Sequence, residues 1–141
     1  MAAAARQTLG IKPGTTTLVV GMSTSGARDL IGELPEGAVV EDVGSTADLV
    51  IFFATSVDDV RQGAANAYAK TAVSGRCWVA YRKGASRTPA PASGEPALHR
   101  DTLQAALAEA GLDGVTLIAL DDSWSAMRIK KVSASAPAPP V

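Results

Sequence analysis

A short loop flanked by two glycines is the first place in the chain that could bind a small molecule. Residues 21–26 (Gly-Met-Ser-Thr-Ser-Gly) join an apolar run to a helical pattern. Glycines in such a loop let backbone N–H groups approach a ligand that faces the following helix. The glycine spacing is sparser than G-x-G-x-x-G, and the Gly-Lys-Ser/Thr ending of phosphate-binding loops is missing. Gly21, Ser23 and Gly26 are therefore candidate cofactor-binding residues, with an ordinary strand-to-helix turn as the alternative.

An acidic pair closes the next expected strand. Glu41-Asp42 lies at the end of the run Ala38–Val43. At this position an acidic side chain holds ribose hydroxyls in several nucleotide-binding folds. Asp42 therefore joins the candidate cofactor-binding residues, and a solvated strand end is the alternative.

A group of cations follows the expected strand Arg76–Tyr81. Arg82, Lys83 and Arg87 lie close together in sequence, with the hydroxyl of Ser86 among them. Guanidinium and ammonium groups at the carboxyl end of a strand can bind a carboxylate or a phosphate. These four residues are candidate anion-binding residues, and a solvated loop explains them equally well.

The other chemistry-bearing residues favour structural roles. Asp121 and Asp122 could do acid–base work, but a hairpin turn explains them without chemistry, with Trp124 packed at the sheet edge. His99 is the only histidine, expected to be exposed in a first helical turn, and has no second ligand in motif spacing. Cys77, the only cysteine, is expected to be a small buried hydrophobe, which excludes a disulfide framework and a zinc cluster. No catalytic or metal-binding residue is predicted.

One apolar run determines the elements that must position these residues. The segment Ala47–Ser56 is uninterruptedly apolar from Leu49 to Ala54. A strand of this kind must be covered on both faces, as the inner strands of parallel sheets are. Thr55-Ser56 can cap a helix, and an amphipathic pattern continues from Val57 to about Val73. Strand, cap and helix together form half of a βαβ unit.

Strands and helices alternate through the rest of the chain. Further strands are expected at Thr16–Met22, Ala38–Val43, Arg76–Tyr81, Val115–Leu120 and Ala126–Val132, and further helices at Ala27–Leu34 and His99–Leu112. This order predicts an α/β fold with a mostly parallel Rossmann-like sheet, helices on both faces and a C-terminal antiparallel hairpin. Because ligands bind beyond the carboxyl ends of parallel strands, the candidate residues are expected along one edge of the sheet.

Composition indicates one globular domain. The chain has 141 residues, of which 47% are hydrophobic, and a formal net charge of −1. This nearly balanced charge gives no overall electrostatic attraction to nucleic acid or anionic lipid, and no apolar run is long enough to cross a membrane. We expect a flexible segment at 1–8, a single domain at 9–132 and a disordered Ala/Pro-rich tail at 133–141. No secretory signal pattern is present, so the cytoplasm is the expected location.

Three segments carry a family resemblance. Leu9–Gly14, Gly75–Gly84 and the segment Asp121–Arg128 together resemble the DUF3052 family of small bacterial proteins, over roughly residues 9–132. The resemblance implies a fold more than an activity.

More remotely, the order of elements resembles a shortened class I methyltransferase domain. The shared features are a glycine-bearing first loop, an acidic end to the second strand and a reversed final hairpin. The middle βα units of a full methyltransferase are missing, because only Gly44–Thr46 separates the second and third strands. This resemblance implies S-adenosylmethionine as the cofactor to consider, with Gly21, Ser23, Gly26 and Asp42 as its contacts.

Three classes of function follow from these observations. The first is a non-catalytic binding or regulatory module that meets an unknown protein or a small anionic ligand at the carboxyl edge of the sheet. The second is a nucleotide- or S-adenosylmethionine-binding enzyme of methyltransferase type, with Arg82 and Lys83 near the acceptor, and the missing units argue against it. The third is a homo-oligomeric scaffold, in which Phe52, Phe53 and the terminal hairpin form an interface if a sheet face or edge is bare.

Overall fold

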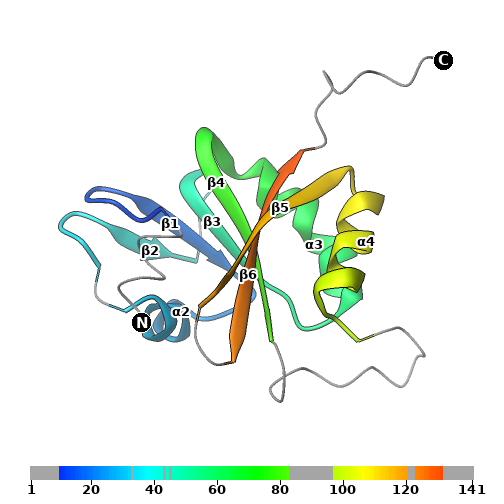
Figure 1. The fold of residues 1–141 in the computed structure, drawn as a ribbon. Coiled ribbons are helices and arrows are strands. Elements are labelled where there is room, and N and C mark those ends of the chain that lie inside the picture. The colour runs from blue at the N-terminus through cyan, green and yellow to red at the C-terminus, as the bar shows by residue number, and fades with distance from the viewer. Residues whose placement is uncertain are drawn as a thin grey trace.

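The computed structural model describes residues 10–32, 34–42, 44, 46–82, 97–120 and 123–131. Its strands form one six-stranded sheet in the order β2-β1-β3-β4-β6-β5 (Figure 1). In chain order the elements are β1 (Thr16–Val20), α2 (Thr24–Ile31), β2 (Val39–Glu41), β3 (Ala47–Phe53), α3 (Val57–Ala69), β4 (Thr71–Arg82), α4 (Arg100–Glu109), β5 (Leu112–Ala119) and β6 (Trp124–Lys131).

The sheet is mostly parallel, as the alternation of strands and helices predicts. β1 pairs in parallel with β2 and β3, and β3 pairs in parallel with β4. β6 is antiparallel to both of its neighbours, β4 and β5. The predicted fold class is therefore confirmed, including the C-terminal antiparallel pair.

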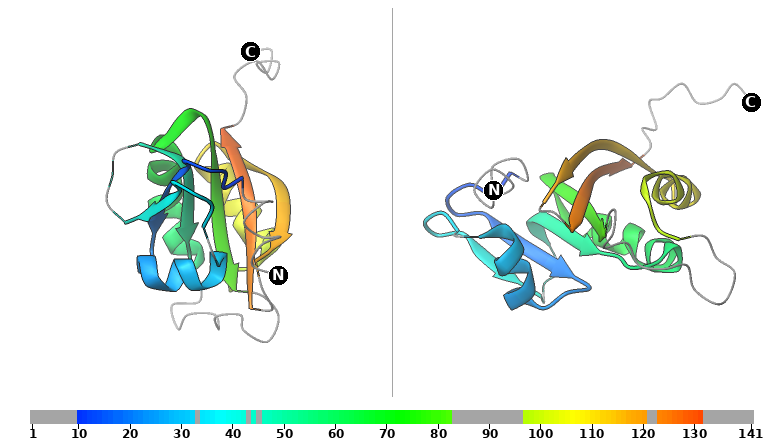
Figure 2. Two further views of the ribbon diagram at one scale, coloured as in Figure 1. Left: turned by 90° about the vertical axis from the view of Figure 1, so that its left-hand side faces the viewer. Right: turned by 60° about the horizontal axis from the view of Figure 1, so that its bottom comes forward.

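Two apolar cores lie on the two faces of this sheet. Val50 and Phe52 of β3 pack in the core under α3 and α4, and Ile51 and Phe53 pack in the core under α2. Figure 2 shows α3 and α4 side by side, with α2 apart from them. Every residue of β3 from Leu49 onward is buried, which confirms that this strand is covered on both faces.

Only five residues separate β2 from β3, too few for a crossover helix. β2 is the outermost strand, and β1 lies between it and β3 in the sheet. A Cβ atom added to Gly44 would lie 3.8 Å from Leu18 Cδ1, so Gly44 lies on the face of β1 that holds α3. So short a link can connect parallel strands here because β2 has only three residues.

The start of β4 differs from the sequence prediction. The sequence predicts a helix to about Val73 and a strand from Arg76, but α3 ends at Ala69 and β4 begins at Thr71. The register between β3 and β4 shifts between Ala47 and Leu49, so β4 carries extra residues there. A Cβ atom at Gly75 would lie 2.3 Å from the Asp48 carbonyl oxygen. The glycine therefore permits a close approach of two strands, a requirement that local sequence does not reveal.

The position of Trp124 also differs from the prediction. β6 lies between β4 and β5, so Trp124 is inside the sheet and not at its edge. The ring is buried and packs edge-on against Phe53, with ring centroids 5.3 Å apart. None of the helices in the described part of the chain has the length and apolar character needed to cross a membrane.

Candidate functional site

The crossovers of the sheet diverge between β1 and β3. From β1 the chain passes through α2 on one face and reaches β2, whereas from β3 it passes through α3 on the other face and reaches β4. The carboxyl ends of β1 and β3 are therefore neighbours whose following helices lie on opposite faces. Ligands of open α/β sheets bind at such a topological switch point.

A hollow of about 270 Å³ lies at this point, and we call it the switch-point hollow. Its described lining comes from the end of β1, the end of β3 and the first half of α3: Gly21, Phe52, Phe53, Thr55, Asp59, Gln62 and Gly63. Its volume is slightly below the range of pockets that enclose a whole drug-sized ligand, so it suits one part of a small molecule.

Gly21 is fixed in place by the neighbouring strand. Its φ is +87°, and a Cβ atom there would lie 2.3 Å from the Phe53 carbonyl oxygen. Any side chain would separate the ends of β1 and β3. Gly21, a candidate residue from the sequence, therefore lines the hollow and also permits the close approach of the ends of β1 and β3.

Ser23 and Gly26 lie together at the start of α2. Ser23 is the N-cap residue, and its Oγ accepts a hydrogen bond from the Gly26 backbone N–H at 3.0 Å. A serine hydroxyl still has one hydrogen to donate after accepting this bond. Capping accounts for the local sequence, and neither residue belongs to the described lining of the switch-point hollow.

Asp42 and Arg82 lie on either side of the hollow's strands. Asp42 is exposed directly after β2, next to β1, and Arg82 ends β4, next to β3. The Arg82 guanidinium carbon lies 4.8 Å from the centroid of the Trp124 ring, in a cation–π contact. Of the predicted anion-binding residues only Arg82 is described, because Lys83, Ser86 and Arg87 lie outside the described residues, as do Asp121 and Asp122.

Asp59 was not among the predicted site residues, yet it supplies the charge of the hollow. Its Oδ2 accepts hydrogen bonds from the backbone N–H and the hydroxyl of Thr55, both at 2.9 Å. Burial alone would raise the pKa of Asp59, but the hydrogen bonds from Thr55 and Ser56 outweigh it and lower the pKa below its ordinary value. The group is therefore a carboxylate at neutral pH, and it lines the hollow.

A capping motif could have identified Asp59 in the sequence. Ser56 caps α3 through a hydrogen bond from the Asp59 backbone N–H to Ser56 Oγ at 3.0 Å, and the Asp59 side chain reaches back to Thr55. An acidic residue three positions after a Ser cap is the sequence signature of this reciprocal arrangement. Within the described residues, no group of three or more His, Cys, Asp or Glu side chains could hold a metal ion.

Comparison with solved structures identifies the class of fold. Mitomycin 7-O-methyltransferase MmcR is 11% identical with a TM-score of 0.63, and the match covers 92% of this chain and 53% of that one. A SAM-dependent methyltransferase from Aquifex aeolicus is 11% identical with a TM-score of 0.53, over 91% and 88% of the two chains. Fibrillarin from Aeropyrum pernix, solved with natively bound S-adenosyl-L-methionine, is 12% identical with a TM-score of 0.53, over 90% and 73%.

These likenesses show that the chain has a methyltransferase-like Rossmann fold. The chain spans about half the length of MmcR and of the pyocyanin biosynthetic protein PhzM, 53% and 54% respectively. No protein-family model and no curated protein matches the sequence. The resemblance to the DUF3052 family therefore stays a prediction.

Proposed function

We propose that this protein is a non-catalytic binding or regulatory module that holds a small nucleoside-bearing ligand in the switch-point hollow. The supporting observation is the coincidence of the hollow with the point where the crossovers diverge, between Gly21 after β1 and Asp59 after β3. The methyltransferase-like fold supports the ligand class, since fibrillarin of this fold class was solved with S-adenosyl-L-methionine bound.

The chemistry of the lining favours S-adenosylmethionine over a nucleotide. Phe52 and Phe53 provide apolar surface, and the Asp59 carboxylate provides the one charge among the described lining residues. A carboxylate attracts ribose hydroxyls and the positive charges of S-adenosylmethionine, and it repels a phosphate. This sign also argues against a small anionic ligand in the hollow itself. Asp42 is not part of the described lining, so the predicted ribose contact stays a prediction.

The same carboxylate supports a binding role in place of a catalytic one. Among the described lining residues Asp59 is the only titratable group, and hydrogen bonds from Thr55 and Ser56 keep it ionised. A proton-transfer catalyst needs a pKa near the working pH. Asp59 can orient a ligand but is poorly suited to exchanging a proton with it.

Isothermal titration calorimetry with S-adenosylmethionine tests this proposal. We expect saturable binding that Asp59→Asn weakens about tenfold, the usual cost of losing a charged hydrogen-bond acceptor. Asp101→Asn is the matched control, because it removes a carboxylate from the first turn of α4, and binding should stay unchanged. Absence of heat in the wild-type protein would refute the proposal, and turnover of bound S-adenosylmethionine with a methyl acceptor would refute its non-catalytic part.

A homo-oligomeric scaffold is a second candidate function, supported by the edge strand β5. Phe52 and Phe53 cannot form the interface, because they are 6% and 4% exposed. In the described chain β5 pairs only with β6, and its Val115 and Leu117 are 45% and 44% exposed. Antiparallel pairing of β5 with a second copy, centred on Thr116, would place Val115 against Leu117 of that copy and satisfy two-fold symmetry.

Light scattering after gel filtration separates this candidate from a monomer. Val115→Lys/Leu117→Lys should convert a dimer to a monomer, because lysines on an edge strand block pairing. Val39→Lys on the opposite edge strand, β2, is the control and should leave the dimer intact. A wild-type monomer at all concentrations would eliminate the scaffold.

A further inference from the structure

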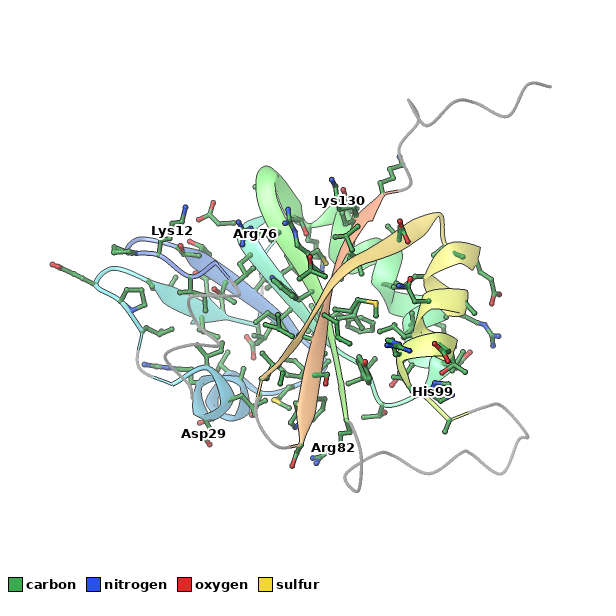
Figure 3. All side chains as sticks on the ribbon, viewed as in Figure 1. Lys12, Asp29, Arg76, Arg82, His99 and Lys130 are labelled. Carbon is green, nitrogen blue, oxygen red and sulfur yellow. The ribbon has the colours of Figure 1, made fainter. Side chains whose placement is uncertain are left out.

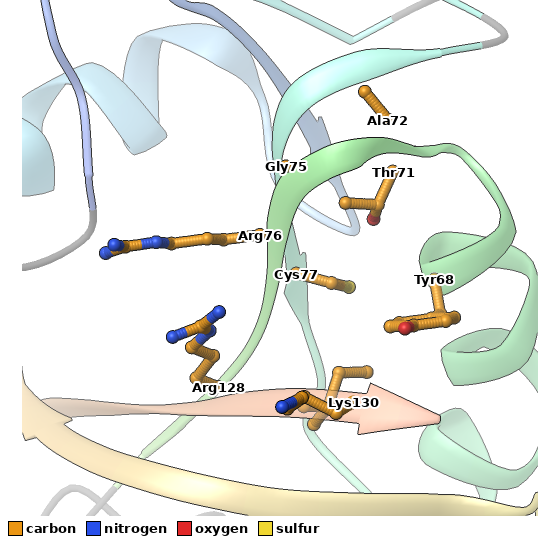
Figure 4. A pocket seen from close by; sticks show the side chains of 9 residues that line it. Tyr68, Thr71, Ala72, Gly75, Arg76, Cys77, Arg128 and Lys130 are labelled. Atoms are coloured by element: carbon orange, nitrogen blue, oxygen red, sulfur yellow. The ribbon is translucent and has the colours of Figure 1, made fainter. Parts of the chain in front are cut away.

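β4 and β6 separate at the amino end of the sheet. Their pairing begins at Cys77 opposite Ile129, and the preceding part of β4 bends away to follow β3. A hollow of about 380 Å³ lies where the two strands part (Figure 4), and we call it the β4–β6 fork. The fork is at the opposite end of the sheet from Arg82 and the switch-point hollow, as the labels of Arg76, Lys130 and Arg82 in Figure 3 show.

Three cations line one side of the fork. In Figure 4 Arg76 and Arg128 lie on one side of β4, and Cys77 and Tyr68 lie on the other. Lys130 also lines the fork and, two residues after Arg128, shares its face of β6. Arg76 and Lys130 lie next to Cys77 and Ile129, the last paired residues, where the strands part, and Arg128 is paired with Trp78. Like charges gathered at one hollow repel one another. The cluster therefore needs a compensating anion to be favourable.

The described carboxylates compensate this charge only in part. Asp113 of β5 stands opposite Lys130 in the β5–β6 register, but no ion pair among the described residues includes any of the three cations of the fork. Arg76 and Arg128 are half-buried, and no ion pair among the described residues includes either guanidinium. An arginine in this state is suited to bidentate binding of an oxyanion.

Arg76 is held in position from two directions. Gly75 lets the backbone of β4 approach the Asp48 carbonyl oxygen, and the Arg76 side chain lies on Gly10, where an added Cβ atom would be 3.2 Å from Nη1. Lys12 joins Arg76 in a smaller adjoining hollow of about 230 Å³. The carboxylate there, Asp48, already accepts a hydrogen bond from the Thr16 backbone N–H at 3.0 Å through Oδ2. Lys12 thus extends the positive charge beyond the fork, and neighbouring residues set the position of Arg76.

We propose that the β4–β6 fork is a second ligand site, which binds a small molecule bearing two or more phosphate groups. Arg76 and Arg128 bind phosphate oxygens in pairs, Lys130 adds a point charge, and Lys12 neutralises the distal phosphate. Tyr68, on the far side of Cys77, provides a ring for the organic part of the ligand. This site is independent of the switch-point hollow, whose carboxylate selects for the opposite charge.

Calorimetric titration of the full chain with inorganic pyrophosphate tests the site. Arg76→Gln/Arg128→Gln should weaken binding at least about tenfold, since each bidentate contact is a charge-assisted hydrogen-bond pair. Arg28→Gln/Arg100→Gln removes the same charge from exposed helix positions and should leave binding unchanged. Thermal unfolding of each variant, measured in parallel, separates loss of the site from loss of the fold.

Three outcomes would overturn the proposal. The first is no binding of pyrophosphate by the wild-type protein at low ionic strength. The second is an equal loss in both double variants, which would mean that only net charge matters. The third is tighter binding of a duplex oligonucleotide that depends on the same two arginines, which would assign the surface to nucleic acid. Asp59→Asn should leave pyrophosphate binding intact. Failure of the fork proposal can therefore be distinguished from failure of the proposed function of the switch-point hollow.

Discussion

At the scale of single residues, Cys77 shows how burial sets chemistry. Cys77 lies on β4, between β3 and β6, and its thiol is buried in the core under α3. Burial raises the pKa of the thiol to about 12, although a hydrogen bond with Thr71 acts in the opposite direction. A thiol with so high a pKa is neither a nucleophile nor a metal ligand at neutral pH. The sequence prediction of a small buried hydrophobe is confirmed.

The raised pKa of Cys77 predicts a loss of stability in alkali. The folded-state pKa of about 12 lies above the ordinary value of 9.0, so the unfolded chain releases the thiol proton first. Keeping the Cys77 thiol protonated therefore stabilises the folded state fully below pH 9, and this stabilisation is lost as the pH rises toward 12. Between pH 8.5 and 10 the free energy of unfolding should fall by about 1 kcal/mol more in the wild-type protein than in Cys77→Ala.

Urea unfolding of both proteins across this pH range measures the difference. Lysines and tyrosines titrate in both proteins, so their contributions cancel in the comparison. Parallel pH profiles for the two proteins would show that the Cys77 thiol is more exposed to solvent than the structure has it.

Residue types at the candidate site could be identified from sequence more readily than their contacts. Gly21 was singled out from its place after a strand, and it lines the switch-point hollow. Ser23 and Gly26 were singled out by the same reasoning, but they bind each other to cap α2. The capping motif could have drawn attention to Asp59 but not to its place in the hollow. That place depends on how α3 packs against the end of β1, which a local sequence pattern does not specify.

At the scale of elements, a glycine in the middle of α3 is explained by the strand beneath it. A Cβ atom at Gly63 would lie 2.6 Å from Phe52 Cζ and 3.0 Å from Cε1. Glycine in a helix interior costs about 1 kcal/mol relative to alanine. Here that cost allows the Phe52 ring to lie directly against the helix, in the wall of the switch-point hollow.

Gly63→Ala is therefore expected to destabilise the protein even though alanine favours helix. Displacing a buried aromatic ring costs about 1–3 kcal/mol, which exceeds the gain in helix propensity. In a Phe52→Leu background the clash disappears, and the same substitution should become stabilising by up to about 1 kcal/mol. Thermal unfolding of the four proteins in this cycle gives the two effects, and equal effects of Gly63→Ala in both backgrounds would contradict the assigned packing.

Helix termini were predictable to the extent that their signals are local. Ser56 was expected to be able to cap the helix that follows β3, and it does so. His99 was expected to be exposed in the first turn, but it is the half-buried N-cap of α4, with Nδ1 accepting from the Asp101 N–H and Thr102 Oγ1 accepting from the His99 N–H. The predicted start of β4 was wrong because Gly75 permits a close approach to the Asp48 carbonyl oxygen, and Asp48 is distant in sequence.

At the scale of the whole molecule, strand order determines where the two proposed sites lie. The sequence predicts a parallel sheet with a terminal hairpin, but not that β6 inserts between β4 and β5. That insertion places Arg128 beside β4 and creates the β4–β6 fork, a site that no local motif indicates. The switch-point hollow, by contrast, follows from the βαβ order, so its location could be predicted while its lining could not.

The shared central strand predicts that the two cores unfold as one unit. Val50 is fully buried on the α3 and α4 face, and Trp78, on the neighbouring strand, is buried on the α2 face. Val50→Ala removes two methyl groups from the first face and should lower the free energy of unfolding by about 2 kcal/mol. Because β3 belongs to both cores, tryptophan fluorescence, which reports the α2 face, should shift by the same amount as the helical circular dichroism signal. A fluorescence transition that stays in place while the dichroism transition moves would show that the faces unfold separately, and a ligand bound at one end of the sheet would then stabilise only its own half.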